Sequence, residues 1–184
     1  MLHKFRKYIY PRKKIVELIP NNSKILDLGC GQGDILQILN NKKNIKYYKG
    51  IDPKLKNKIE SKNSILKPLD IGNVIKEIPQ YNCILLIDVL HHIKRDDQKV
   101  VIENIINQLN NGTIFIYKDI SNRNFFYATM NRLHDFFYNN EIINYYEVDK
   151  IINFIKKDKS ISYKRFYHRI FWYDHEFLII KKKI

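Results

Sequence analysis

Three glycines, Gly29, Gly31 and Gly33, alternate with other residues and mark the stretch best suited to bind a ligand. The run 25–28, apolar except for Asp27, predicts a buried parallel strand before them, and a helical pattern begins directly after the third glycine. In such a strand–loop–helix unit, backbone N–H groups and a helix N-terminus face a bound anion. The spacing G-x-G-x-G matches neither the dinucleotide fingerprint nor a phosphate P-loop.

Carboxylates and histidines follow other predicted strands. Asp52 lies about 20 residues beyond the glycine loop, where nucleotide-binding units place a carboxylate that accepts the ribose hydroxyls. Asp88, His91 and His92 follow a second apolar strand, and Asp119 follows a third. Open α/β sheets bind ligands at the carboxyl ends of their parallel strands. A histidine suits a general base, so His92 is the leading catalytic candidate, with His91 and Asp119 as further candidates.

The order of the predicted elements indicates an α/β fold. Up to residue 118, apolar runs of strand length alternate with segments of helical spacing, which is typical of a parallel sheet covered by helices. The remaining chain adds two helical segments and then two strands. In chain order, we expect strands over 25–28, 45–51, 64–71, 81–87, 113–118, 160–171 and 175–182, and helices over 12–19, 35–39, 95–109, 124–138 and 148–155.

Residues 25–33, Ile-Leu-Asp-Leu-Gly-Cys-Gly-Gln-Gly, resemble motif I of the class I S-adenosylmethionine-dependent methyltransferases. The resemblance implies one Rossmann-like α/β domain over 1–184, with a seven-stranded, mostly parallel sheet, a terminal antiparallel strand and helices on both faces. It also implies an N-terminal helical extension over 1–22 and a helical insertion over 121–158 on the acceptor side. The aromatic side chains of 124–138 suggest an apolar acceptor pocket or, equally, ordinary core packing.

The same resemblance implies the cofactor-binding residues. In the family the glycine loop holds the methionine part of S-adenosylmethionine, the acidic residue of the first strand (Asp27) helps to place its amino group, and Asp52 binds the ribose. Asp70 matches the residue that meets the adenine amino group and Ile71 its neighbour on the ring, although Asp70 suits equally the cap of a helix starting at Gly72. The full expected set is Asp27, Gly29, Cys30, Gly31, Gln32, Gly33, Asp52, Pro53, Asp70, Ile71, Asp88 and Val89.

The segment 88–93 resembles motif IV of small-molecule methyltransferases. It lacks the Asn-Pro-Pro-Tyr or Asp-Pro-Pro-Tyr sequence of enzymes that methylate exocyclic amines of nucleic-acid bases. Methyl transfer from a sulfonium is an in-line displacement that mainly needs orientation, and a hydroxyl acceptor benefits from a base such as His92. His134 and Asp135 are a second candidate orienting pair. We expect methyl transfer from S-adenosylmethionine to a small-molecule or lipid-like acceptor, with O-methylation slightly favoured.

A metal centre is not expected. Asp88, His92 and Asp119 are conceivable ligands, but the metal-dependent catechol-type enzymes carry Asp-Asn after the fifth strand. Here Asp119 is followed by Ile120 and Ser121.

The composition bears on partners and compartment. Lys and Arg number 33 against 19 Asp and Glu, and the formal charge of +14 favours attraction to nucleic acid or an anionic membrane surface. The basic residues are spread along the chain, however, so an RNA methyltransferase stays an alternative, as does a cofactor-binding regulatory subunit without transfer activity. Cys30 and Cys83 form neither a disulfide framework nor a metal site, and no run approaches the ~20 apolar residues of a membrane span. We therefore expect a cytoplasmic protein, with its oligomeric state open.

Overall fold

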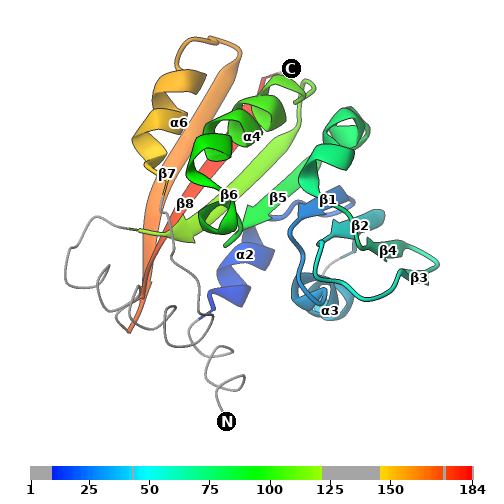
Figure 1. Ribbon diagram of the computed structural model, residues 1–184. Coiled ribbons are helices and arrows are strands. Elements are labelled where there is room, and N and C mark those ends of the chain that lie inside the picture. Colours follow the sequence, from blue (N-terminus) through cyan, green and yellow to red (C-terminus); the bar gives the residue numbers. More distant parts are fainter. Residues whose placement is uncertain (1–9, 43, 122–145, 172, 184) are drawn as a thin grey trace.

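The computed structural model describes residues 10–42, 44–121, 146–171 and 173–183 (Figure 1). The expected helix 124–138, with His134 and Asp135, lies outside the described residues. The described elements are α2 (Arg12–Leu18), β1 (Lys24–Leu28), α3 (Asp34–Lys42), β2 (Tyr47–Ile51), β3 (Ile59–Ser61), β4 (Ser64–Lys67), η1 (Ile71–Asn73), η2 (Ile75–Gln80), β5 (Cys83–Ile87), η3 (Leu90–His92), α4 (Arg95–Asn107), β6 (Ile114–Ile120), α6 (Val148–Ile155), β7 (Ile161–Ile170) and β8 (Tyr173–Lys182).

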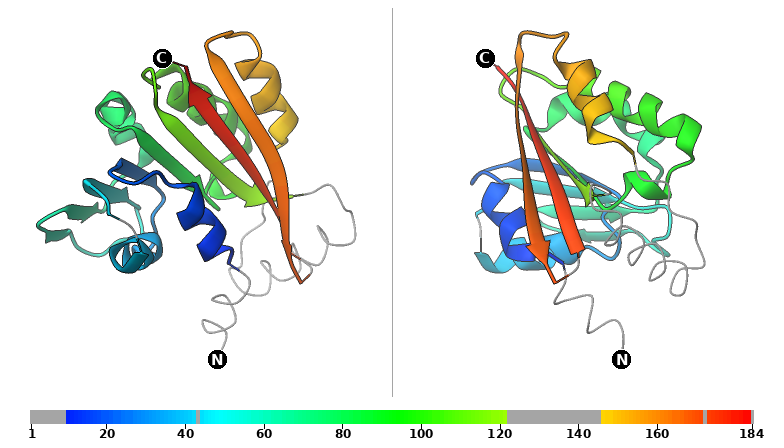
Figure 2. Two further views of the ribbon diagram at one scale, coloured as in Figure 1. Left: turned by 180° about the vertical axis from the view of Figure 1, so that it is seen from behind. Right: turned by 90° about the vertical axis from the view of Figure 1, so that its left-hand side faces the viewer.

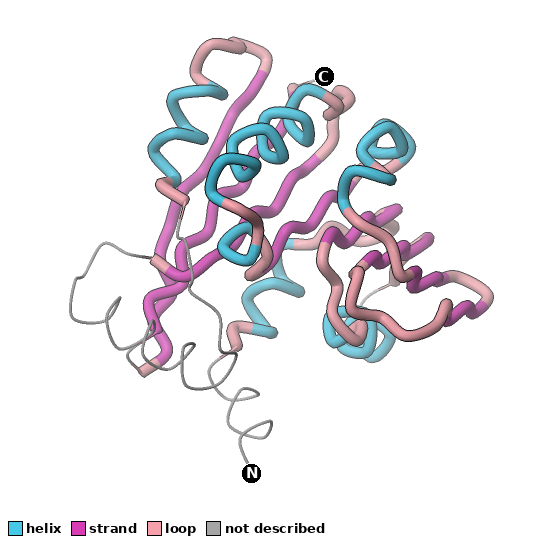
Figure 3. The backbone as a smooth tube through the Cα atoms, viewed as in Figure 1, coloured by secondary structure: helices cyan, strands magenta, loops and turns pink. Residues whose placement is uncertain are grey.

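The described strands form one sheet in the order β3-β4-β2-β1-β5-β6-β8-β7. Strands β4, β2, β1, β5 and β6 pair in parallel, and β8 runs antiparallel to both β6 and β7. The Rossmann-like, mostly parallel sheet is confirmed, but it has eight described strands instead of seven. The additional strand is β3, which pairs antiparallel with β4 at one edge (Figure 3). All its residues are exposed, so no pattern of buried apolar positions predicted it.

Helices cover both faces of the sheet (Figure 2). On one face, apolar side chains of α4 and α6 pack with those of β1, β5, β6 and β8 into one core cluster. On the other face, α2 and α3 pack against the same sheet in a second cluster. The central strand β5 is buried along its whole length, as expected for a parallel strand with helices on both sides.

The topology brings the predicted site to one edge of the sheet. The carboxyl ends of β1, β2, β4, β5 and β6 meet there, and the antiparallel β8 begins at the same edge. The boundaries that differ from the sequence prediction at this edge include the end of β4, at Lys67 instead of residue 71, the end of β6, at Ile120, so that Asp119 lies within it, and the start of β8, at Tyr173. β6 is longer because it pairs with β8 as far as Ile120. β8 begins earlier because Tyr173 and Asp174 pair with Ile170 and Arg169 of β7.

Within the described part of the chain, no helix is both long enough and apolar enough to cross a lipid bilayer.

Candidate active site

The glycine loop joins β1 to α3 and is hydrogen-bonded to the end of β2. The N–H groups of Gly29 and Cys30 both donate to the carbonyl oxygen of Ile51, at 2.8 and 2.9 Å. Gly31 has a φ of 55°, and its N–H donates to Oδ2 of Asp52 at 2.9 Å. A Cβ placed on Gly31 would meet no heavy atom within 4 Å, so the backbone is open to a ligand at this point. The structure therefore brings together the loop and Asp52, which the sequence predicted to share one ligand.

Asp52 is half-buried at the carboxyl end of β2, and Pro53 after it is exposed. Its Oδ1 accepts the N–H of Lys54 at 2.8 Å, while Oδ2 accepts that of Gly31. Each oxygen thus holds one main-chain donor. A carboxylate offers about four lone-pair sites, so two further donors can be accepted.

Asp27 lies in β1 with 1% of its surface exposed. The hydroxyl of Tyr48, on the neighbouring β2, donates to Oδ2 of Asp27. Burial raises the pKa of Asp27 to about 7; the hydrogen bond from Tyr48 opposes this shift, and the charge of Asp52 adds to it. Sequence reasoning missed Tyr48, although a tyrosine at a fully buried position of a central strand requires a polar partner for its hydroxyl.

Asp88 directly follows β5 and is paired with Lys118 of β6. Nζ of Lys118 lies 2.6 Å from both carboxylate oxygens, and the two side chains are 1% (Lys118) and 17% (Asp88) exposed. The N–H of Asp88 also donates to the carbonyl oxygen of Lys118 at 2.8 Å. Burial is the largest single influence and opposes ionisation of Asp88. The positive charge of Lys118, together with the charges of His175 and His91 and the hydrogen bond from Lys118, outweighs burial and holds the pKa of Asp88 below its ordinary value. The sequence did not reveal this pair because its members lie on different strands.

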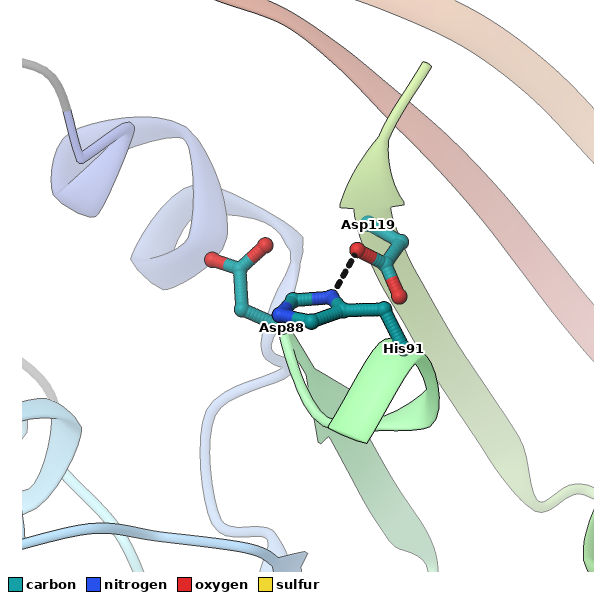
Figure 4. Close-up of side chains that lie close together, drawn as sticks. All are labelled: Asp88, His91 and Asp119. Carbon is teal, nitrogen blue, oxygen red and sulfur yellow. Dashed lines mark hydrogen bonds and ion pairs between the residues drawn. The ribbon is translucent and has the colours of Figure 1, made fainter. Parts of the chain in front are cut away.

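His91 and Asp119 form a buried pair near Asp88 (Figure 4). Nδ1 of His91, in η3, lies 2.5 Å from Oδ1 of Asp119. The same Oδ1 accepts the N–H of Ile120 at 2.8 Å. On the other side of the ring, Nε2 of His91 lies 3.1 Å from Nε2 of His92, which is exposed. The three residues predicted as catalytic candidates therefore form one continuous hydrogen-bonded chain.

The same residues include a group with metal-ligand chemistry. Donor atoms of Asp88, His91 and Asp119 lie within 4.8 Å of one another. However, the ammonium of Lys118 contacts both oxygens of Asp88 and places a positive charge where a cation would need that carboxylate. The donor set does not fit a metal ion in this arrangement, and the expectation of no metal stays a prediction.

The predicted adenine contacts lie at the end of β4. Asp70 is the N-cap of η1, and its N–H donates to Oδ1 of Asn73 at 3.2 Å. The structure thus shows the capping role that the sequence left open beside adenine binding. Asp70 is exposed and Ile71 is half-buried.

The remaining predicted cofactor residues line the loop. Cys30 is buried, and burial raises the pKa of its thiol far above the ordinary value. Gln32 is exposed. Gly33 has a φ of 82°, and a Cβ there would lie 2.8 Å from Cδ1 of Leu66, so it packs closely against β4. Val89 is half-buried after Asp88 and packs against the first glycine of the loop.

Buried polar residues at the start of β8 were not predicted. His175 lies opposite Ile120 of β6, and the N–H of Ser121 donates to the carbonyl oxygen of Asp174 at 2.7 Å. Asp174 and His175 are 2% and 3% exposed. They lie at the same edge of the sheet as the predicted site because β8 pairs antiparallel with β6. The sequence pattern does not predict this pairing.

Comparisons with known proteins identify the family. A family model described as a methyltransferase domain matches residues 1–157. A search of curated proteins found no match. Among solved structures, the putative methyltransferase complexed with the Haloferax volcanii Trm112 activator has a TM-score of 0.74 at 10% identity, over 99% of this chain and 93% of that chain.

Two further structures share the fold. The N-methyltransferase NodS from Bradyrhizobium japonicum WM9 has a TM-score of 0.60 at 13% identity, over 94% of each chain. Magnesium protoporphyrin IX methyltransferase from Synechocystis PCC 6803, crystallised with bound S-adenosylmethionine, has a TM-score of 0.61 at 14% identity, over 94% of this chain and 78% of that chain. The family model covers most of the sequence and the sheet carries the expected glycine loop; this chain therefore belongs to the class I methyltransferases, the family whose cofactor is S-adenosylmethionine.

Proposed function

We propose that the chain transfers the methyl group of S-adenosylmethionine to a small-molecule or lipid-like acceptor, with an oxygen atom favoured as the acceptor. The cofactor brings its own activated methyl group, so the protein has to hold it, orient the acceptor and accept a proton. The proposal treats residues 1–184 as one domain, with the extension 1–22 and the insertion 121–158 on the acceptor side.

The open loop supports cofactor binding at the edge of the sheet. The N–H of Gly31 is hydrogen-bonded to Asp52, and the space next to the Cα atom of Gly31 is open. In the proposed arrangement, the loop residues 29–33 hold the methionine part and Asp52 accepts the ribose hydroxyls with its remaining lone pairs. Asp27 and Asp88 lie toward the methionine amino group in this arrangement. Asp27, with its pKa of about 7, is the carboxylate that ionises there, because Asp88 is already paired with Lys118. In the same proposed arrangement, the nucleoside part contacts Pro53, Asp70, Ile71 and Val89.

The hydrogen-bonded series Asp119–His91–His92 is the observation that supports the proposed acceptor chemistry. With Asp119 accepting the Nδ1–H of neutral His91, Nε2 of His91 holds a lone pair and accepts the Nε2–H of His92. The basic lone pair of His92 then lies on Nδ1. When His92 takes a proton there, its positive charge is stabilised through His91 by the buried carboxylate of Asp119. This arrangement suits a general base for a hydroxyl acceptor.

A methyl-transfer assay with labelled S-adenosylmethionine tests the proposal, with pools of hydroxyl-bearing small molecules, lipid extracts and RNA as acceptors. We expect label in a small-molecule or lipid product. We also expect His92→Asn to lower kcat by about 10²–10⁴-fold while cofactor affinity is unchanged. His168→Asn, a histidine of β7, is the matched control and should leave kcat unchanged.

The net charge of +14 favours RNA as the second acceptor class. Incorporation into RNA alone, with binding that weakens steeply as salt rises, would replace the proposed acceptor. Cofactor binding without transfer to any pool would favour the regulatory-subunit alternative.

A further inference from the structure

Gln98 is a polar side chain in the buried, otherwise apolar stripe of α4. The buried residues of this helix recur at helical spacing and are Gln98, Ile102, Ile105 and Ile106. The three isoleucines belong to the core cluster between α4 and the sheet, and only 1% of the surface of Gln98 is exposed. A side-chain amide at such a position costs stability unless it is hydrogen-bonded, so its partners indicate what it does there.

The amide nitrogen of Gln98 donates to two main-chain carbonyl oxygens of one turn. The first is that of Leu90, at 3.0 Å, and the second is that of Ile93, at 3.1 Å. Leu90 is the first residue of η3 and Ile93 is its C-cap, so the amide spans the turn that carries His91 and His92 (Figure 4). Two hydrogen bonds from α4 therefore hold a 3-10 turn that is only three residues long.

The same turn sets the direction of both histidine rings. Nδ1 of His91 is paired with Asp119, and Nε2 of His91 lies 3.1 Å from Nε2 of His92. The two rings stay in this line only while the main chain of η3 keeps its place relative to β6, which carries Asp119. Misplacement of a reacting group by about 1 Å can cost about 10²-fold in rate, so a contact that fixes this main chain bears on the reaction.

We propose that Gln98 is a positioning residue for the general base: its amide holds η3 so that His91 and His92 stay in line and Nδ1 of His92 is presented to the acceptor. The assignment rests on the proposed function, because it requires His92 to be the base. It gives a role in the reaction to a residue of α4 that acts only through the turn it holds.

Replacement of Gln98 by Met tests the proposal, because methionine keeps the length of the side chain and removes both donated hydrogen bonds. In the methyl-transfer assay we expect Gln98→Met to lower kcat by about 10- to 100-fold. The affinity for S-adenosylhomocysteine in calorimetry should stay within about twofold of the wild type, because cofactor binding does not require the base. Ile102→Val, one turn further along the buried stripe of α4, is the matched control for lost packing and should leave kcat unchanged.

A double-variant cycle separates positioning from a general loss of structure. If Gln98 acts through His92, Gln98→Met should lower kcat by less than about twofold in a chain that already carries His92→Asn. An equal loss in the two backgrounds overturns the proposal, and so does an unchanged kcat in folded Gln98→Met. Gln98→Leu is made alongside, so that loss of folding in one variant, detected by thermal unfolding, leaves the other as the test.

Hydrogen exchange measured by NMR tests the hold on the turn without an acceptor. The N–H of His92 donates to the carbonyl oxygen of Val89 at 2.9 Å, and that of Ile93 to the carbonyl oxygen of Leu90 at 3.0 Å, so these two amides close the turn. Gln98→Met should speed their exchange by about tenfold or more. Unchanged exchange overturns the proposal. Absence of transfer by the wild type would instead overturn the proposed function, and the exchange rates would still decide whether Gln98 holds η3.

Discussion

Replacement of Lys118 by Met tests the energetic role of the buried pair with Asp88. Methionine keeps the apolar stem of the side chain but removes the ammonium, which lies 2.6 Å from both carboxylate oxygens. The carboxylate of Asp88 is only 17% exposed and cannot regain full hydration. Removal of one partner of a buried ion pair costs about 3–5 kcal/mol, and the partial exposure of Asp88 places this case near 3 kcal/mol. For a chain of this length, that corresponds to a fall of about 6–12 °C in Tm.

The loss should depend on pH in a defined direction. The wild-type pKa of Asp88 is below its ordinary value, so the pair stabilises the fold above pH 4 and this contribution is lost as pH falls through the lowered pKa. Without Lys118, burial raises the pKa of Asp88, and the variant can relieve the unpaired charge by protonation. The difference in unfolding free energy between wild type and variant should therefore be large at pH 7.5 and smaller at pH 4.5.

Urea unfolding at the two pH values measures this difference. Lys49→Met is the matched control, because Lys49 is also paired at 2.6 Å, but with Glu77, whose side chain is 34% exposed and hydrates more easily. The double variant Lys118→Met/Asp88→Asn removes both charges and should recover most of the lost stability. A loss for Lys118→Met no greater than that for Lys49→Met at pH 7.5 would refute the reasoning.

Further predictions concern the glycine loop and the buried carboxylate of β1. Gly29→Ala forces a Cβ into the side chain of Val89 at a φ of 80°, so it should destabilise the fold more than Gly31→Ala, whose Cβ meets open space and costs only about 1–2 kcal/mol for its positive φ. Gly31→Ala should instead weaken cofactor binding. Thermal unfolding measures the stability of the two variants and calorimetry their cofactor affinity. Equal losses of stability and equal losses of affinity in the two variants would contradict this prediction. Because the folded pKa of Asp27 is raised from 3.8 to about 7, protonated Asp27 stabilises the fold fully below pH 4, and this contribution is lost as pH rises toward 7. The unfolding free energy of Asp27→Asn minus that of the wild type should therefore increase from pH 4 to pH 8, by up to about 4 kcal/mol at 1.4 kcal/mol per pKa unit. A difference that is constant with pH would contradict the assignment.

The sequence predicted those parts of the fold that periodic burial determines. β5 is a continuous apolar run, and β1 is apolar from Ile25 to Leu28 except for Asp27, because both faces of these strands are covered. Such runs are visible without a structure. The strand β3 has no buried residue, and its place depends only on pairing with β4. No local pattern could indicate it.

The candidate site was predictable where its residues follow strands in parallel order. Asp52, Asp88 and Asp119 reach one edge because parallel strands share a direction. The partners of these carboxylates were not predictable. Lys118 and Tyr48 pair across strands, and Tyr10 reaches the edge from the N-terminal segment, so each contact depends on three-dimensional packing.

Calorimetric titration with S-adenosylhomocysteine, comparing the wild type with Asp52→Ala, tests the central claim most directly. The claim is that the open glycine loop and the carboxylate of Asp52, which accepts a hydrogen bond from it, form one nucleoside-binding site. We predict one site per chain in the wild type and an affinity lower by roughly tenfold or more in Asp52→Ala, equivalent to the loss of a hydrogen bond to a charged group. Equal affinity of the two proteins, or no binding to the wild type, would contradict it.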